Sequence, residues 1–324
     1  MIDLRSDTVT KPTKGMLDKM FSAQVGDDVF GDDPTVIELQ EKIANMFGME
    51  SAIYCPSGTM TNQIAIKTHT NPGDEIICDR LSHIYNYEGG GIASNSGVST
   101  RLLDGDRGRY KASEVAKNIN PDDEHYPITS LVSIENTCNK GGGSIWNFKD
   151  IKEIANICNK RSLKLHLDGA RLFNALVVTR QQPKDFGKIF DSISICLTKG
   201  LGAPIGSLLL GGNEFIKTAR RVRKVFGGAM RQVGYLAAAG IYALDEHIDR
   251  LEEDHRNAKI IEGALKDLSF IKSILPVETN IIVFKLQEEL QVNTFLEKLK
   301  AQNIFAIKID HQTVRMVTHL GIDG

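Results

Sequence analysis

An aspartate, an arginine and a lysine follow two short apolar runs near the middle of the chain. Asp168 and Arg171 come after residues 163–167, Leu-Lys-Leu-His-Leu. Lys199 comes after residues 192–197, Ser-Ile-Ser-Ile-Cys-Leu. Short runs of this kind, bounded by glycine and proline, are typical of strands. Because ligands of an open α/β sheet bind outside the carboxyl ends of its strands, we expect the three side chains at one edge of a sheet.

Each of these side chains also has an ordinary explanation. A lysine is usually a solvated surface group, Asp-Gly is a common turn, and an arginine after a turn is usually a surface donor. Pyridoxal 5'-phosphate, however, needs a lysine for its Schiff base and an acid near its pyridine nitrogen. The glycines around Lys199 would let the backbone approach a ligand closely. The combination therefore predicts a pyridoxal phosphate site.

A turn and a helix start earlier in the chain could hold the phosphate of this cofactor. Residues 52–55 are typical of a strand, and residues 56–58, Pro-Ser-Gly, lead from it into a helix that begins at Thr59. A helix start has free N–H groups and a positive dipole end. Many strand–helix junctions share this pattern, which is neither a P-loop nor GxGxxG. Together with Lys199, it predicts that Gly58 and Thr59 bind the phosphate.

Motifs along the whole chain resemble the threonine aldolase family. They are Ser-Asp-Thr-Val-Thr at 6–10, Gly-Asp-Asp-Val-Phe-Gly at 26–31, Pro-Ser-Gly-Thr-Met-Thr-Asn at 56–62, His-Leu-Asp-Gly-Ala-Arg at 166–171, Lys-Gly-Leu-Gly-Ala-Pro at 199–204, Gly-Gly-Ala-Met-Arg-Gln at 227–232 and Arg-Met-Val-Thr-His at 315–319. The resemblance implies a pyridoxal phosphate lyase that cleaves L-threonine or L-allo-threonine to glycine and acetaldehyde. The sequence leaves the preference between the two diastereomers open.

The resemblance also implies roles for residues around the cofactor. Lys199 would form the Schiff base, and Asp168 would keep the pyridine nitrogen protonated. His83 would stack on the pyridine ring. Lys224 and Arg231 would bind the cofactor from a neighbouring subunit, although a basic run such as residues 213–226 is usually a solvated helix face.

Three other residues are assigned to the substrate carboxylate by the same resemblance. They are Ser6, Arg171 and Arg315; Arg171 is also a candidate partner of the cofactor. A guanidinium holds a carboxylate through two parallel hydrogen bonds, which fixes its orientation. His83 and His125 are the candidate general bases, because imidazole titrates near the working pH.

The fold implied by the resemblance is the fold-type-I α/β fold of pyridoxal phosphate enzymes. It has a large domain with a mixed, mostly parallel sheet between helices, and a small C-terminal α+β domain. A chain of 324 residues is long for one core and agrees with two domains. We expect the cofactor-binding domain over residues 1–245 and the small domain over residues 246–324. A closing helix would be expected after Thr318 and His319, and since the chain ends at Gly324 we expect a truncated C-terminus.

Composition excludes several other classes of protein. The net charge is −2, so no basic surface points to nucleic acid. No apolar run approaches the roughly 20 residues of a membrane helix, and the first residues lack the layout of a signal peptide. Five cysteines are scattered without a CxxC pair, which argues against disulfides and a metal site. We expect a cytoplasmic protein, and the resemblance implies a homotetramer, a dimer of dimers with sites at subunit boundaries.

Other enzymes that use the same scaffold are the nearest alternatives. β-Eliminating lyases and aminotransferases also need a lysine, an aspartate and an arginine that binds the substrate carboxylate. A protein that binds pyridoxal phosphate without catalysis is a further alternative. The chain departs from the family at Cys138, where members often carry histidine, and this leaves the role of that position open.

Overall fold

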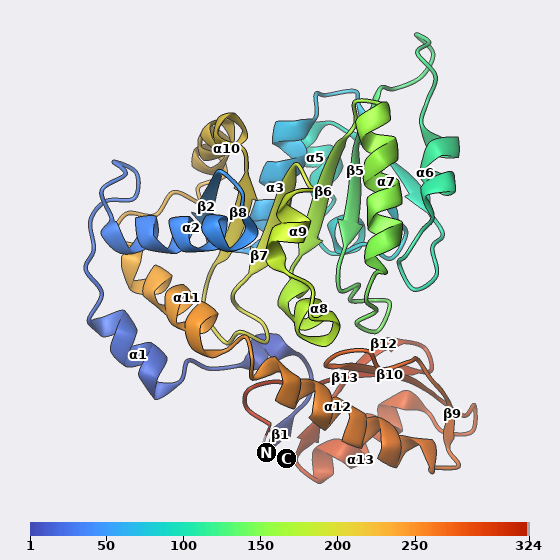
Figure 1. Ribbon diagram of the computed structural model, residues 1–324. Helices are drawn as coiled ribbons and strands as arrows, with labels where there is room; N and C mark the ends of the chain where they lie inside the picture. Colours follow the sequence, from blue (N-terminus) through green and yellow to red (C-terminus); the bar gives the residue numbers. More distant parts are fainter. Residues whose placement is uncertain (323–324) are drawn as a thin grey trace.

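A seven-stranded sheet forms the centre of the computed structural model, which describes residues 1–322 (Figure 1). Its strand order is β2-β8-β7-β6-β5-β3-β4. The strands are β2 (Ser51–Cys55), β3 (Glu75–Asp79), β4 (Ser99–Leu103), β5 (Thr129–Glu135), β6 (Lys164–Gly169), β7 (Ser192–Cys196) and β8 (Ser207–Gly211). Strand β8 runs antiparallel to both of its neighbours, whereas the pairs from β7 to β4 are parallel. The predicted mixed, mostly parallel sheet is confirmed.

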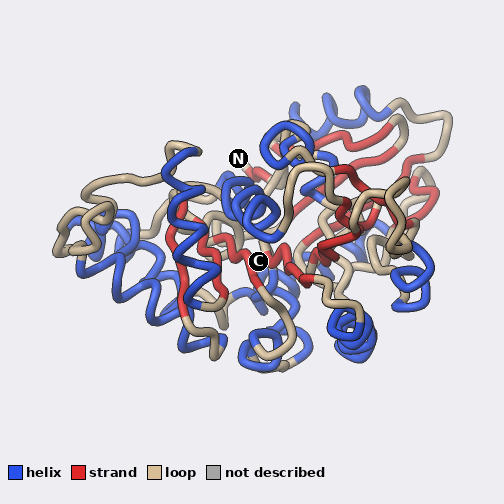
Figure 2. Tube along the Cα trace, turned by 90° about the horizontal axis from the view of Figure 1, so that it is seen from above, coloured by secondary structure: helices blue, strands red, loops and turns tan. Residues whose placement is uncertain are grey.

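Helices cover both faces of this sheet (Figures 1 and 2). One face packs against α2 (Pro34–Phe47), α7 (Phe148–Lys160), α8 (Leu172–Thr179), α9 (Pro183–Gly187) and α11 (Gly234–Glu246). The other face packs against α3 (Gly58–His69), α5 (Gly91–Ser96) and α10 (Asn213–Val225). Successive residues of a strand point to opposite faces, so Ile76 and Ile77 lie in different apolar clusters. Burial on both faces explains why the central strands are nearly continuous apolar runs.

The C-terminal part of the chain builds a smaller unit with its own core. Four antiparallel strands occur in the order β12-β13-β10-β9. They are β9 (Ile271–Ile274), β10 (Ile281–Leu286), β12 (Ile307–Asp310) and β13 (Thr313–Val317), and helices α12 (Leu251–Lys266) and α13 (Val292–Ala301) belong to the same unit. The predicted small α+β unit is confirmed.

The first strand of the chain lies with this C-terminal unit. Strand β1 (Ile2–Asp3) pairs in parallel with β11 (Ile304–Phe305), and Leu4 belongs to the smaller core. The end of β13 lies beside this segment, because the N–H of Val317 donates to the carbonyl of Leu4 at 2.9 Å. The division of the chain between residues 245 and 246 stays a prediction.

The remaining helices are short and connect the larger elements. They are a 3₁₀ helix (Asp7–Val9), α1 (Lys14–Phe21), α4 (His83–Asn86) and α6 (Ala112–Asn118). No helix among residues 1–322 is long and apolar enough to cross a membrane. Since the strands from β7 to β4 are parallel, the residues that follow β3, β5, β6 and β7 meet at one edge of the sheet.

Candidate functional site

A cavity of about 430 Å³ opens at the carboxyl ends of the parallel strands. Strands β5, β6 and β7 contribute Glu135, Asp168 and Cys196 to its wall. Predicted site residues that line it are Gly58, Thr59, His83, Asp168, Arg171 and Lys199. The structure therefore brings together residues from distant parts of the sequence, as expected.

The start of helix α3 forms one wall of the cavity. Ser57 caps this helix, because its Oγ accepts a hydrogen bond of 3.2 Å from the N–H of Met60. Within the described residues the cap leaves the N–H groups of Gly58 and Thr59 available for a ligand. A Cβ on Gly58 would lie 2.4 Å from the Sγ of Cys196, so only glycine fits here without movement. This wall suits a phosphate.

Asp168 is held in place by donors to both of its carboxylate oxygens. Oδ1 accepts from the N–H of Ala170 at 3.1 Å, and Oδ2 accepts from Nδ2 of Asn62 at 2.9 Å. The Oδ1 of Asn62 in turn accepts from Nε2 of His166 at 3.1 Å. Burial lowers the pKa of His166 to about 4 even though Asp168 opposes this shift, so the imidazole is neutral. The pyridine nitrogen of a cofactor would meet a carboxylate that cannot rotate freely.

His83 begins helix α4 and is fixed by two buried carboxylates. Its N–H donates to Oε2 of Glu135 at 2.7 Å, and its Nδ1 lies 2.9 Å from Oε1 of Glu88. Burial raises the pKa of Glu135 to about 7, and the nearby charge of Asp168 adds to the effect. Glu135 also accepts from the N–H of Asn139 at 2.7 Å, so it joins the loops that carry His83 and Asn139.

Side chains that can bind cations gather near His83 but are already satisfied. One ligand atom each of His83, Glu88 and Asp168 lies within 4.8 Å of the others. The amide of Asn62 donates to both carboxylates, at 2.9 Å in each case. Because N–H groups already occupy this cluster, the geometry supports a hydrogen-bonded network instead of a metal site.

Lys199 follows β7, in the turn that leads to β8. Its Nζ donates to the Sγ of Cys196 at 3.2 Å, and both residues line the cavity. The lysine therefore stands at the carboxyl end of a strand with its amine inside the cavity, as the sequence predicts.

Arg171 forms a buried bidentate ion pair with Asp7. Its Nε and Nη2 donate to Oδ2 and Oδ1 of Asp7, both at 2.7 Å. Burial alone would raise the pKa of Asp7, but the Arg171 guanidinium, together with Lys199 and Asn280, outweighs burial and lowers that pKa to about 2. Two of the three guanidinium nitrogens thus bond to Asp7, and among residues 1–322 no partner is found for Nη1.

Arg315 lies on β13 close to this pair, and its guanidinium is only partly paired. Its Nη1 donates to Oδ1 of Asn139 at 2.9 Å, and Nη2 to the carbonyl of Arg5 at 3.2 Å. Its buried Nε has no partner among residues 1–322. Burial, together with the charge of Arg171, lowers the pKa of Arg315 to about 10. A buried guanidinium nitrogen without a partner, near the charge of Arg171, fits a bound anion.

Arg315 and the remaining predicted site residues are not among the residues that line the cavity. Ser6 caps the 3₁₀ helix, where its Oγ accepts from the N–H of Thr8 at 3.2 Å. His125 is 80% exposed and pairs with Asp123. Lys224 is exposed on α10, and exposed Arg231 pairs with Asp27 at 2.8 Å. The functional roles of these residues stay predictions.

Several residues at or near the site are not predicted from the sequence. They are Asp7, Asn62, Glu88 and Asn139, and Glu135 was given no role. Glu135 ends an apolar strand as Asp168 does, and this signal could have identified it. Asp7 and Arg171 lie 164 residues apart in the sequence, and no local pattern joins them.

These groups together fit pyridoxal 5'-phosphate. The fit rests on four features in one region of the fold. They are the amine of Lys199, the hydrogen-bonded carboxylate of Asp168, the N–H groups at the start of α3 and the unpaired Nε of Arg315. Lys199, Asp168 and the N–H groups of Gly58 and Thr59 could hold the aldehyde carbon, the pyridine nitrogen and the phosphate of the cofactor, respectively.

Comparison with known proteins identifies relatives over nearly the whole chain. The β-eliminating lyase family matches residues 3–289. The low-specificity L-threonine aldolase of Escherichia coli K12 is 43% identical over 323 residues, which cover 99% of this chain and 95% of that protein. Low-specificity L-threonine aldolase 1 of Arabidopsis thaliana is 38% identical over 325 residues, covering 98% and 91% of the two chains.

A solved structure has the same fold. Threonine aldolase of Leishmania major superimposes with a TM-score of 0.86 and 22% identity, over 100% of this chain and 95% of that chain. This similarity of fold agrees with the fold type expected from the sequence.

Proposed function

The chain belongs to the β-eliminating lyase family and, within it, to the low-specificity threonine aldolases, and from this membership we propose the reaction of its cavity. The enzyme is a lyase that uses pyridoxal 5'-phosphate to cleave L-threonine and L-allo-threonine to glycine and acetaldehyde. The observation that carries the proposal is the presence of Lys199 and Asp168 in one cavity with the start of helix α3.

The residues of the cavity would hold the cofactor at three points. Pyridoxal phosphate, when bound, supplies a conjugated ring that takes up electrons from a bond broken at Cα of the amino acid. The amine of Lys199 would attach the cofactor, and the N–H groups of Gly58 and Thr59 would bind its phosphate. The carboxylate of Asp168 would keep a proton on the pyridine nitrogen, and His83 would pack on the ring.

The carboxylate of the substrate would be bound by the arginines next to the cavity. Nε of Arg315 lacks a protein partner within residues 1–322, and Nη1 of Arg171 is also available. Ser6 precedes the helix that carries Asp7 and would add a hydroxyl to this group. A carboxylate held at a fixed point sets the orientation of the bonds at Cα, which decides the bond that reacts.

His83 would accept the proton of the substrate β-hydroxyl. It lines the cavity, whereas His125 is 80% exposed on a loop, and this difference supports His83 as the base. Imidazole is suited to the task because it exchanges a proton near neutral pH.

The enzyme would act as a homotetramer in the cytoplasm. Lys224 and Arg231 do not line the cavity of their own chain, which supports a role at the cofactor site of a neighbouring subunit. Large apolar side chains are exposed beside them: Val225 is 79% exposed, as is Phe30, whose ring is 5.6 Å from the Cζ of Arg231.

All five cysteines are free, which agrees with a reducing compartment.

Product analysis tests the proposed reaction. The purified protein, loaded with pyridoxal phosphate, should cleave L-threonine and L-allo-threonine. Each substrate should give one molecule of glycine for each molecule of acetaldehyde. Ammonia and a keto acid would instead indicate a β-eliminating reaction, and bound cofactor without any product would indicate a binding protein.

A further inference from the structure

Glu88 is a buried carboxylate that lies behind His83 as seen from the cavity. It is 6% exposed and does not line the cavity. Its Oε1 accepts from Nδ2 of Asn62 at 2.9 Å, and Oε2 accepts from Nε2 of Gln63 at 2.7 Å. Nδ1 of His83 lies 2.9 Å from Oε1. A buried carboxylate with this many donors is held in one orientation.

The donors around Glu88 determine where the proton of His83 lies. The amide of Asn62 must turn its NH₂ group toward Glu88 and Asp168, because its oxygen would otherwise face two acceptors. Glu88 already accepts from the amides of Asn62 and Gln63, so its carboxylate is also the acceptor in the contact with Nδ1 of His83. Nδ1 of His83 therefore carries the proton, and Nε2 is the nitrogen left to exchange a proton with a ligand.

We propose that Glu88 is a positioning residue of the aldolase reaction, which keeps the proton on Nδ1 of His83 and presents Nε2 to the substrate. The inference rests on the proposed function, since it assigns a residue that acts through His83. The amide of Asn62 donates to both Glu88 and Asp168. It therefore links the carboxylate that contacts His83 to the carboxylate assigned to the pyridine nitrogen.

The charges around His83 support a role for Glu88 in its protonation. Burial is the largest single effect and opposes the charged imidazole, but the hydrogen bond to Glu88 and the nearby carboxylate charges together outweigh burial, and the pKa of His83 is raised. The charges of Asp168 and Glu135 act in the same direction. The ring of Tyr87 also lies near the imidazole, with centroids 5.5 Å apart, and Nζ of Lys140 is 5.5 Å from the centroid of the Tyr87 ring.

The pH dependence of the chemical reactivity of His83 tests this inference. In the cofactor-loaded protein, diethyl pyrocarbonate acylates the neutral imidazole, and mass spectrometry of the His83 peptide gives its rate at each pH. Glu88→Gln keeps an acceptor but removes the charge, so we expect the midpoint of the profile to move down by about one pH unit. An unchanged midpoint would overturn the inference.

Gln63→Leu is the matched control for damage to the network. It removes one donor from the same carboxylate but does not touch the His83 contact. The His83 midpoint should therefore stay close to that of the unmodified enzyme. If Gln63→Leu shifts the midpoint as far as Glu88→Gln does, the effect comes from general loosening and the inference fails.

A double-substitution cycle on cleavage tests whether Glu88 acts through His83. Glu88→Gln should lower kcat for threonine about tenfold in the normal enzyme and change it less than twofold in a His83→Asn background. Equal losses in both backgrounds would refute the role. Because the acylation assay uses no substrate, a chain that shows the midpoint shift but does not cleave threonine would refute the proposed function alone.

Discussion

The ion pair between Asp7 and Arg171 shows how single residues determine the site. Both side chains are almost completely buried, at 0% and 6% exposure. A buried charge is tolerated only with a partner, and removal of one partner leaves the other charge desolvated. Asp7 also accepts from Nδ2 of Asn280 at 3.2 Å, so this carboxylate connects the N-terminus, the large unit and the small unit.

Replacement of Asp7 by asparagine should destabilise the fold and weaken substrate binding. Arg171 would lose its charged partner while still buried, and we expect the free energy of unfolding to fall by about 3 kcal/mol. Urea unfolding measures this change, and a glycine titration measures affinity. Asp104→Asn is the control, because its pair with Arg80 is exposed and its loss should change stability little. Equal stability of Asp7→Asn and the unmodified enzyme would contradict the account.

The start of helix α3 shows how an element presents backbone groups to a ligand. The helix follows strand β2 after the turn at residues 56–57, and its first turn lines the cavity. Its capping residue occupies the N–H of Met60 and leaves the preceding N–H groups for the phosphate. The close approach of this turn to Cys196 fixes the position of these donors.

Gly58→Ala should weaken cofactor binding about tenfold. The new Cβ would lie 2.4 Å from the Sγ of Cys196 and would displace the first turn of α3. An absorbance titration of the cofactor-free protein with pyridoxal phosphate gives the affinity.

Two variants serve as controls for Gly58→Ala. Cys196→Ala in the same chain should restore much of the affinity, because it removes the clash. Gly263→Ala on α12 meets no atom within 4 Å and should leave cofactor binding unchanged. Normal affinity of Gly58→Ala itself would show that this turn does not hold the phosphate.

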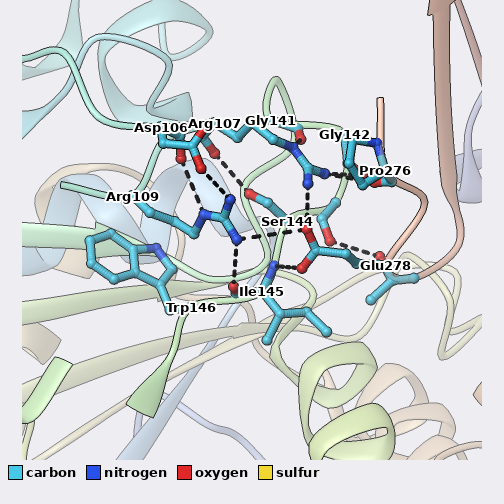
Figure 3. Close-up of polar contacts among 12 residues, drawn as sticks. Asp106, Arg107, Arg109, Gly141, Gly142, Ser144, Ile145, Trp146, Pro276 and Glu278 are labelled. Carbon is cyan, nitrogen blue, oxygen red and sulfur yellow. Dashed lines mark hydrogen bonds and ion pairs between the residues drawn. The ribbon is translucent and has the colours of Figure 1, made fainter. Parts of the chain in front are cut away.

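At the scale of the whole molecule, an ion pair between Arg107 and Glu278 joins the two units (Figure 3). Arg107, in the loop after β4, pairs with Glu278 and donates to the carbonyls of Gly141 and Pro276 at 2.7 and 2.8 Å. Glu278 also accepts from the N–H of Ile145 at 2.9 Å. The loop over residues 139–145 is thus tied to the small unit at both ends, through Asn139 to Arg315 and through Ile145 to Glu278.

Glu278→Gln should weaken substrate binding while leaving the cofactor in place. Loosening of the loop would shift Asn139, which supports Arg315, and we expect KM for threonine to rise about fivefold, or about 1 kcal/mol. Steady-state kinetics and the absorbance of the bound cofactor separate the two effects. Glu288→Gln, which breaks an exposed pair with Lys272 in the same unit, is the control. A lower kcat at unchanged KM would contradict this interpretation.

The sequence predicted the sheet and the residues at its edge, because strands and the turns after them have local patterns. Asp168 and Lys199 could be found in this way, and the family motifs supplied the cofactor. The pairing of β1 with β11 and the contact between Asp7 and Arg171 join distant segments, so no local pattern indicates them. Glu88 was missed for a different reason, since its partners lie on other elements and its own segment is irregular.

Chemical localisation of the cofactor tests the central claim most directly. Borohydride reduction of the cofactor-loaded enzyme fixes the cofactor to the amine that holds it, and tandem mass spectrometry of the digested chain identifies that lysine. We predict the added mass on Lys199, with no label in the same digest of Lys199→Ala. A label on another lysine, or an unlabelled chain after exposure to pyridoxal phosphate, would contradict the assignment of the site and of the reaction built on it.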